Sequence, residues 1–226
     1  MRDVQVFQKQ DYIYTPYFCE ENIRQLCRSF ISQGIDKDQL EILFLSNNKK
    51  QIVLLNQQLG SLSEVVVWDY HVILKYHPDA YTSMIFDFDT RLPFPVDWQS
   101  YQHSTFPDPR QLESDYHMMI RKIPSSEYLT QFTSDRKHMA HLPTSAYPNY
   151  ECIKAKDSSS SICLKDYWEM DKEIEGNSYS YSYEATLSLP IALINPVANL
   201  LRHVMFSGPC FFDMLQRSSF QFQSSI

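Results

Sequence analysis

Apolar residues recur at helical spacing in the segment that begins at Cys19. The repeating positions are Ile23, Leu26, Cys27 and Phe30. Their i, i+3, i+4, i+7 spacing places them on one face of a helix. Glu20 and Glu21 suit the positive end of the helix dipole, and Gly34 can end the helix because glycine tolerates a left-handed backbone. The pattern predicts an amphipathic helix from Cys19 to about Gly34.

Four segments after this helix are rich in the β-branched and aromatic residues that favour strands. They are Glu41–Leu45, Gln51–Leu55, Val65–Tyr76 and Ser83–Thr90. The polar residues Ser46–Lys50 join the first two strands, which predicts a hairpin. The prolines of Leu92–Pro95 end the last strand.

The second half of the chain has weaker patterns. Residues 97–150 mix short helical pieces with proline-rich loops, and Ser125–His138 could hold a helix. The segment Leu187–Phe212 is apolar, but three prolines and Arg202 interrupt it. A membrane span needs about 20 largely apolar residues, so we expect no span and no membrane partner.

Composition narrows the class of protein. The chain has 226 residues, of which 43% are hydrophobic and 14% aromatic, so it can bury the core of one domain, alone or with a tail. The net charge is -7 and no block of lysine and arginine occurs, so we expect no nucleic-acid partner.

The cysteines indicate a reducing compartment. They are five in number, Cys19, Cys27, Cys152, Cys163 and Cys210, and no two form a CxxC pair. An odd count without such pairs argues against a disulfide framework and against a zinc knuckle. The first residues lack the apolar stretch of a signal peptide. We therefore expect a cytoplasmic and nuclear protein in which a free thiol persists.

Three short segments contain the residue types of a cysteine acyl-transfer site. Cys19 opens the predicted helix, His71 lies on a predicted strand, and Asp87 lies on the next strand. A thiol nucleophile, an imidazole base and a carboxylate that orients the base are the parts of a catalytic triad. If the hairpin between the last two strands is symmetric about Asp79, His71 lies directly across from Asp87, with Cβ atoms roughly 5 Å apart.

Two further acids compete for the orienting role. Asp69 and Asp89 would lie on the same face as His71, at diagonal positions roughly 7–8 Å away. The cross-strand position favours Asp87. The same alternation predicts that Trp68, Tyr70, Val72, Phe86 and Phe88 face the core.

The position of Cys19 at a helix start has opposing effects on the pKa of its thiol. Free N–H groups and the dipole at a helix start lower a thiol pKa and can bind an oxyanion. The charges of Glu20 and Glu21 would raise that pKa. Simpler roles stay open, since a cysteine at a helix start is often a small buried apolar residue and a histidine in a strand is often a core residue. Cys19, Cys27 and His71 lack zinc-ligand spacing, so we expect no metal.

The chain resembles the protein N-terminal glutamine amidohydrolases, which deamidate an N-terminal Gln to Glu. Seven collinear segments between about residues 12 and 175 carry the resemblance. They are Tyr17–Ile23 with Leu26-Cys27, Phe44–Asn47, Val67–Val72, Phe86–Thr90 with Leu92–Pro95, Tyr128-Leu129 with Phe132, Ser134–Met139, and Tyr147–Ile153.

The resemblance implies a Cys19–His71–Asp87 triad without a cofactor. It also implies an α/β (α+β) fold with an antiparallel central sheet flanked by helices, similar to transglutaminase and papain-like enzymes. Residues 1–176 would form a single catalytic domain, and residues 177–226 a divergent C-terminal tail that could be partly disordered. We expect a monomer whose partners are proteins or peptides with a free N-terminal Gln, and whose Glu product enters an N-degron degradation pathway.

Selectivity for a chain start requires an acid that binds the free α-amino group. Glu20, Glu21, Asp69 and Asp89 are the candidates, and the sequence does not choose among them. Arg136 and His138 could line the pocket or anchor a loop. Alternative functions are a transglutaminase or cysteine protease acting on internal residues, or an interaction module with a silent triad.

Overall fold

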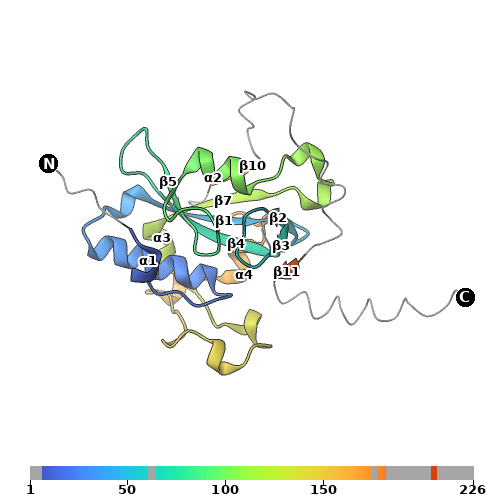
Figure 1. The fold of residues 1–226 in the computed structure, drawn as a ribbon. Helices are drawn as coiled ribbons and strands as arrows, with labels where there is room; N and C mark the ends of the chain where they lie inside the picture. Colours follow the sequence, from blue (N-terminus) through green and yellow to red (C-terminus); the bar gives the residue numbers. More distant parts are fainter. Residues whose placement is uncertain (1–6, 61–64, 175–177, 182–204, 208–226) are drawn as a thin grey trace, which may run out of the picture.

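A central antiparallel sheet organises the chain. The computed structural model describes residues 7–60, 65–174, 178–181 and 205–207 (Figure 1). The strands of this sheet, in spatial order, are β10 (Ser178–Tyr181), β7 (Met119–Pro124), β1 (Leu40–Ser46), β4 (Tyr70–Tyr76), β5 (Met84–Phe86) and β6 (Val96–Asp97). Every neighbouring pair in this sheet runs antiparallel, as the resemblance implied.

Two small sheets and four α-helices complete the described part of the chain. Strands β11 (Met205–Ser207), β3 (Val66–Trp68) and β2 (Ile52–Leu54) form one small sheet, and β8 (Phe132–Thr133) pairs with β9 (Ile162–Cys163) in the other. The helices are α1 (Cys19–Ser32), α2 (Trp98–Thr105), α3 (Ser125–Gln131) and α4 (Leu164–Trp168). Single-turn 3-10 helices occupy Lys9–Asp11, Lys37–Gln39, Pro109–Gln111, Ser114–Tyr116, Lys137–Met139, Thr144–Ala146 and Ser158–Ser160.

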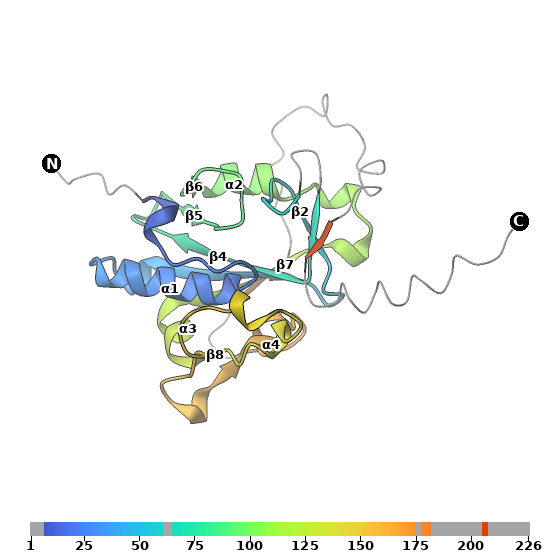
Figure 2. The same cartoon turned by 60° about the horizontal axis from the view of Figure 1, so that its bottom comes forward.

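Helices cover both faces of the central sheet (Figure 2). One face packs against α1, α3 and α4, and its core includes Phe30, Phe44, Phe86 and Tyr167. The other face packs against α2 and the sheet of β2 and β3, through side chains such as Leu45, Ile73, Ile85 and Tyr101. The fold is therefore a mixed α+β arrangement, and its relation to papain-like enzymes stays a prediction. None of the described helices is long and apolar enough to cross a membrane.

Helix α1 confirms the helix predicted from the apolar spacing. Its buried face includes Ile23, Leu26, Cys27 and Phe30. The helix ends in a Schellman motif, in which the N–H of Gly34 bonds the carbonyl of Ile31 at 3.0 Å and the N–H of Ile35 bonds that of Phe30 at 3.1 Å. Gly34 has φ +91°, the left-handed conformation that the prediction required.

The predicted hairpin between Glu41–Leu45 and Gln51–Leu55 is wrong. Both strands form, but β1 pairs with β4 and β7, whereas β2 pairs with β3 in the small sheet. Asn47 explains the change of direction. Its amide oxygen accepts hydrogen bonds from the N–H groups of Lys49 and Gln51, and its nitrogen bonds the carbonyls of Gln51, Asp115 and His117. This network fixes the chain where it leaves the central sheet.

The strand and helix predictions were too long at three other places. The run Val65–Tyr76 divides at Asp69 into β3 and β4, which belong to different sheets. The run Ser83–Thr90 forms a strand only over Met84–Phe86. The helix predicted within Ser125–His138 ends at Gln131, because Phe132 enters β8.

The tail predicted at residues 177–226 lies largely outside the described residues. Within it, Ser178–Tyr181 pairs with β7, and Met205–Ser207 pairs with β3 in parallel. The division of the chain at residue 176 stays a prediction.

Gly34→Ala should destabilise the protein by about 1–2 kcal/mol, because a Cβ disfavours the left-handed backbone even though no heavy atom lies within 4 Å of it. Urea unfolding measures this change. Arg28→Ala, on the exposed face of α1, should alter the free energy of unfolding by less than about 0.5 kcal/mol. Equal effects of the two substitutions would contradict the proposed role of Gly34.

Candidate active site

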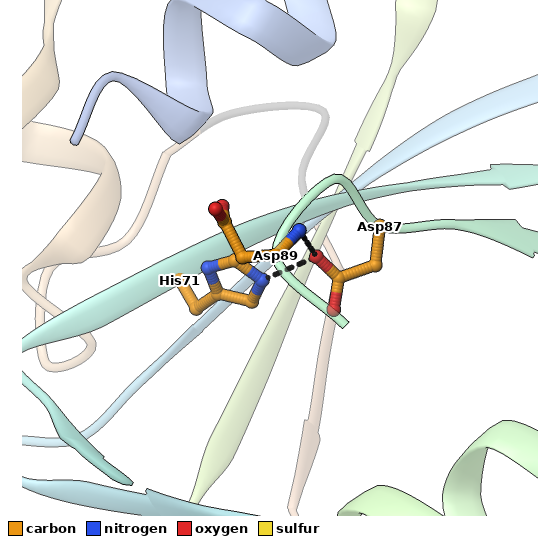
Figure 3. Close-up of side chains that lie close together, drawn as sticks. All are labelled: His71, Asp87 and Asp89. Atoms are coloured by element: carbon orange, nitrogen blue, oxygen red, sulfur yellow. Dashed lines mark hydrogen bonds and ion pairs between the residues drawn. The ribbon is translucent and has the colours of Figure 1, made fainter. Parts of the chain in front are cut away.

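His71 and Asp87 form a buried hydrogen-bonded pair. The Nε2 atom of His71 lies 2.9 Å from Oδ1 of Asp87, and both side chains are fully buried (Figure 3). The Asp87 carboxylate also accepts hydrogen bonds from the Asp89 N–H at 2.8 Å and from the Tyr101 hydroxyl at 2.8 Å. Asp97 caps the helix that carries Tyr101, by accepting a bond from the Ser100 N–H at 3.0 Å. Three donors therefore hold the carboxylate in one orientation.

The register that predicted this pair is wrong, although the two side chains do meet. In the β4–β5 ladder Leu74 pairs with Phe86 and Tyr76 with Met84, so the hairpin is not symmetric about Asp79. A shift of two positions keeps each side chain on its predicted face. Asp87 lies just beyond the end of β5, where its side chain accepts the Asp89 N–H in a tight bend. This bend, and not a ladder position, brings the carboxylate to His71.

The charges of the pair stabilise each other against the cost of burial. Burial lowers the pKa of His71, but the charge and hydrogen bond of Asp87, with a contribution from Asp89, outweigh burial and raise that pKa above its ordinary value. Burial raises the pKa of Asp87, but His71 and the donors from Asp89 and Tyr101 lower it overall. The pair thus favours an ionised carboxylate beside an imidazole that readily takes a proton.

Trp68 covers the ring of His71. The two rings stack with centroids 4.9 Å apart and planes at 28°. The sequence predicted Trp68 on the same core face as Tyr70, Val72, Phe86 and Phe88. Those four residues do pack against α1, but Trp68 belongs to the opposite core. The prediction failed because the strand is interrupted at Asp69, so the alternation of side chains does not continue from β3 into β4.

One ring nitrogen of His71 remains available. Among the described residues, its Nδ1 atom is buried without a hydrogen-bond partner. Because Nε2 is directed at Asp87, the neutral imidazole carries its proton on Nε2 and leaves a lone pair on Nδ1. The imidazole can therefore accept a proton from a group that approaches Nδ1.

Cys19 is the first residue of α1, which packs against β4. The preceding residue, Phe18, provides no side-chain cap for the first turn. The Cys19 sulfur lies 3.8 Å from Oε2 of Glu20. Burial and the charges of Glu20, Asp89 and Asp69 raise the pKa of the thiol, whereas the backbone N–H of Val72 opposes them. The contact with Val72 places the sulfur beside the strand that carries His71, and the raised pKa keeps the thiol protonated at neutral pH.

Glu20 is a fully buried acid beside this thiol. The Tyr70 hydroxyl donates to its Oε2 atom at 3.0 Å, and Nε2 of His138 lies 3.3 Å from its Oε1 atom. Burial lowers the pKa of His138, but the contact with Glu20 raises it overall. His138 therefore compensates the charge of Glu20 within the protein.

Glu21 is held by an arginine from a distant loop. The Arg136 guanidinium donates two hydrogen bonds to its carboxylate, at 3.0 Å and 2.8 Å, and also bonds the carbonyls of Pro148 and Glu151. The side chain of Arg136 is 6% exposed and that of Glu21 is fully buried. The pair anchors the loop that follows β8 to the first turn of α1.

Asp69 and Asp89 differ in exposure. Asp69 is buried, its carboxylate accepts the Tyr70 N–H at 2.9 Å, and burial raises its pKa to about 6. Asp89 is half-buried and accepts the Tyr14 hydroxyl at 2.6 Å. One ligand atom each of His71, Asp87 and Asp89 lies within 4.8 Å of the others, a spacing that could suit a metal ion. The hydrogen bonds already made by Asp87 instead favour a proton-transfer role for this group.

Sequence patterns missed several contacts of the site. These contacts join residues of separate elements. They are the contacts of Tyr101 with Asp87, of Trp68 with His71, of Tyr14 with Asp89, and of Tyr70 and His138 with Glu20. No spacing within the sequence links these partners. The one available signal was the presence of buried acids, because each buried carboxylate requires a donor.

The sequence of this chain is similar to those of known proteins. Residues 14–187 match the family described as N-terminal glutamine amidase. The protein N-terminal glutamine amidohydrolase of Danio rerio is 35% identical over 178 residues, which cover 75% of this chain and 86% of that protein. The Bos taurus relative of the same name is 34% identical over an alignment that covers 72% of this chain and 79% of that protein. The Arabidopsis thaliana relative of the same name is 35% identical over an alignment that covers 64% of this chain and 69% of that protein.

Arg136→Met should lower the free energy of unfolding by about 3–5 kcal/mol, because it leaves the buried carboxylate of Glu21 without a counter-charge. Urea unfolding measures the loss. The double variant with Glu21→Gln should recover part of it.

Lys137→Met is the matched control. Lys137 pairs with Asp135 at 2.6 Å, but both side chains are largely exposed, so stability should change little. A similar loss in the two variants would show that charge in this loop, and not the buried pair, stabilises the protein.

Proposed function

The chain belongs to the protein N-terminal glutamine amidohydrolase family, and from that premise we propose that it deamidates N-terminal glutamine through a triad of Cys19, His71 and Asp87. The buried His71–Asp87 pair, with its second ring nitrogen unpartnered, is the observation that carries this proposal. It provides an oriented base, and the only further requirement is a thiol that can approach Nδ1.

The first half of the reaction forms a thioester. His71 takes the proton from the Cys19 sulfur, and the thiolate attacks the side-chain amide carbon of the N-terminal Gln. Backbone N–H groups at the start of α1, including that of Cys19, stabilise the oxyanion, since Phe18 leaves that turn without a side-chain cap. His71 then gives its proton to the departing nitrogen, so the C–N bond breaks and ammonia leaves.

The second half releases the product. Water gives a proton to His71 and attacks the glutamyl thioester, the C–S bond breaks, and the proton returns to the Cys19 sulfur. Asp87 holds the ring orientation and stabilises the imidazolium in both halves. The chain supplies every group that these steps require, and the net change is one water consumed and one ammonia released.

The electrostatics of the site are consistent with a base-activated thiol. The pKa of Cys19 is raised by burial and by neighbouring acids, so the thiol does not ionise unaided at neutral pH. The pKa of His71 is raised by Asp87, which makes the imidazole a better proton acceptor. Proton transfer to His71 as the substrate binds thus supplies the nucleophile.

The substrates are proteins or peptides that begin with Gln, as the family name implies. We extend the proposal to a cytoplasmic and nuclear monomer whose Glu product enters an N-degron degradation pathway.

Cys19→Ala should reduce ammonia release from a Gln-X peptide by at least about 10³-fold, because it removes the nucleophile. Cys27→Ala should retain most activity, since Cys27 is a buried core residue of the same helix. Circular dichroism should show both variants folded. If Cys27→Ala abolished ammonia release and Cys19→Ala retained it, the nucleophile would be Cys27.

The wild-type protein should release ammonia from Gln-X but not from Asn-X or acetyl-Gln-X. Equal activity on acetyl-Gln-X would instead indicate a transglutaminase-like or protease-like enzyme. A folded protein that is inactive on all three peptides would indicate a silent interaction module.

The pH profile should report the titration of His71. The base must be neutral, and its pKa is raised, so activity should fall as the pH drops through a value above 6.5. Asp87→Asn removes the main cause of the raised pKa while burial remains. Its acid limb should move to lower pH and its kcat should fall by about 10²–10⁴-fold. An unshifted limb would exclude His71 as the titrating group.

A further inference from the structure

An acid that binds the α-ammonium group must lie close to Cys19. In an N-terminal Gln the α-nitrogen is four bonds from the side-chain amide carbon, a span of at most about 5 Å. A hydrogen bond adds about 3 Å. The acid must also have a carboxylate oxygen that a ligand can reach.

Three of the four candidate acids do not meet these requirements. Both oxygens of Glu21 are bonded to Arg136, and the residue is fully buried. Glu20 is also fully buried, between Tyr70 and His138. The Asp69 carboxylate is buried and directed at the N–H of Tyr70. Burial therefore excludes all three of these acids from contact with a ligand.

Asp89 remains. We propose that Asp89 is the specificity-determining residue that binds the α-ammonium group of the substrate's N-terminal Gln, an inference that rests on the function proposed above. Asp89 is the one of the four that is only half-buried. Its charge acts on the Cys19 thiol, and one of its oxygens lies within 4.8 Å of ligand atoms of His71 and Asp87. Its carboxylate therefore adjoins the reacting groups.

The surroundings of Asp89 favour a cationic ligand. In Figure 3 its carboxylate projects away from Asp87, on the side of the imidazole that carries the unpartnered and buried Nδ1 atom. Burial and the charge of Asp87 both raise the pKa of its carboxyl group. The nearby Lys9 ammonium donates its hydrogen bond to the Phe88 carbonyl. A bound α-ammonium would add positive charge beside these two acids, to the charges that Lys9 and His71 already provide.

Tyr14 positions the carboxylate for this role. Its hydroxyl donates to Oδ1 of Asp89 at 2.6 Å, and its ring stacks on Phe88 with centroids 5.5 Å apart. Of the hydrogen bonds that the described residues make to this carboxylate, the bond from Tyr14 engages one oxygen, which leaves the other for the substrate. An acylated or internal Gln has no positive charge at this position and would leave the charge of Asp89 uncompensated, which disfavours its binding.

The test compares two substrates in wild-type and Asp89→Asn protein. The first substrate is a Gln-X peptide, and the second is its desamino analogue, glutaramoyl-X, which keeps the reacting amide but lacks the α-amino group. Asp69→Asn is the matched control, because it removes another acid whose charge acts on Cys19. The measurement is kcat/KM for ammonia release, with KM and kcat determined separately.

Wild-type protein should prefer Gln-X on the order of 10- to 100-fold, as expected for a charge-assisted hydrogen bond. Asp89→Asn should lose most of this preference, chiefly through a higher KM for Gln-X, while turnover of glutaramoyl-X shows that the site is intact. Asp69→Asn should retain the preference. In wild-type protein, KM for Gln-X should also rise above about pH 8, where the α-amino group loses its proton, and this rise should be absent in Asp89→Asn.

A change in the pKa of His71 alone would alter both substrates equally and would leave the preference unchanged. Full retention of the preference in Asp89→Asn would therefore overturn this inference while leaving the deamidase function intact. No ammonia release from Gln-X by folded wild-type protein would instead overturn the proposed function itself.

Discussion

The burial of carboxylates around a single thiol is the constraint on which this structure depends. Glu20 and Glu21 lie in the first turn of α1, Asp69 lies just before β4 and Asp87 just beyond β5, and all four are buried. A buried charge without a partner is unstable by several kcal/mol, so each of these acids requires hydrogen-bond donors. The distant donors, Tyr101, Arg136 and His138, come from α2 and from the loop after β8. The requirement for compensation thus ties these separate segments to the first turn of α1.

The same acids oppose ionisation of the nucleophile. Negative charge near Cys19 raises its thiol pKa, which is unfavourable for a group that must act as a thiolate. The Asp87 charge, however, also raises the pKa of His71 and so strengthens the base. The two effects together favour a neutral thiol beside a good proton acceptor, and formation of the nucleophile is coupled to proton transfer. A substrate that brings a positive charge would ease this transfer further, because it offsets the acids that disfavour the thiolate.

Local patterns predicted the parts of the site better than their connections. The apolar spacing from Ile23 to Phe30 and the conformation of Gly34 gave α1 nearly to the residue, because both depend on neighbours within one turn. Strand alternation predicted the face of β4 that carries His71, whereas Asp87 reaches that face through the bend beyond β5. The hairpin of β1 and β2 failed because Asn47 turns the chain through bonds to Asp115 and His117. Contacts of that kind join residues far apart in the sequence, and no periodicity encodes them.

The exposure of each acid and its partners together separate structural roles from recognition. Glu21, with a bidentate arginine, has its charge fully compensated in the free protein, so a ligand would have to displace Arg136 to bind it. Asp87 is similarly committed to three donors. Asp89 is only partly exposed and accepts its hydrogen bond from a neutral hydroxyl, and burial raises its pKa, so its charge is only partly offset in the free protein. A carboxylate can act as a receptor for a cation when the fold orients it, leaves it accessible and does not neutralise it, and among the acids beside Cys19 this description fits Asp89.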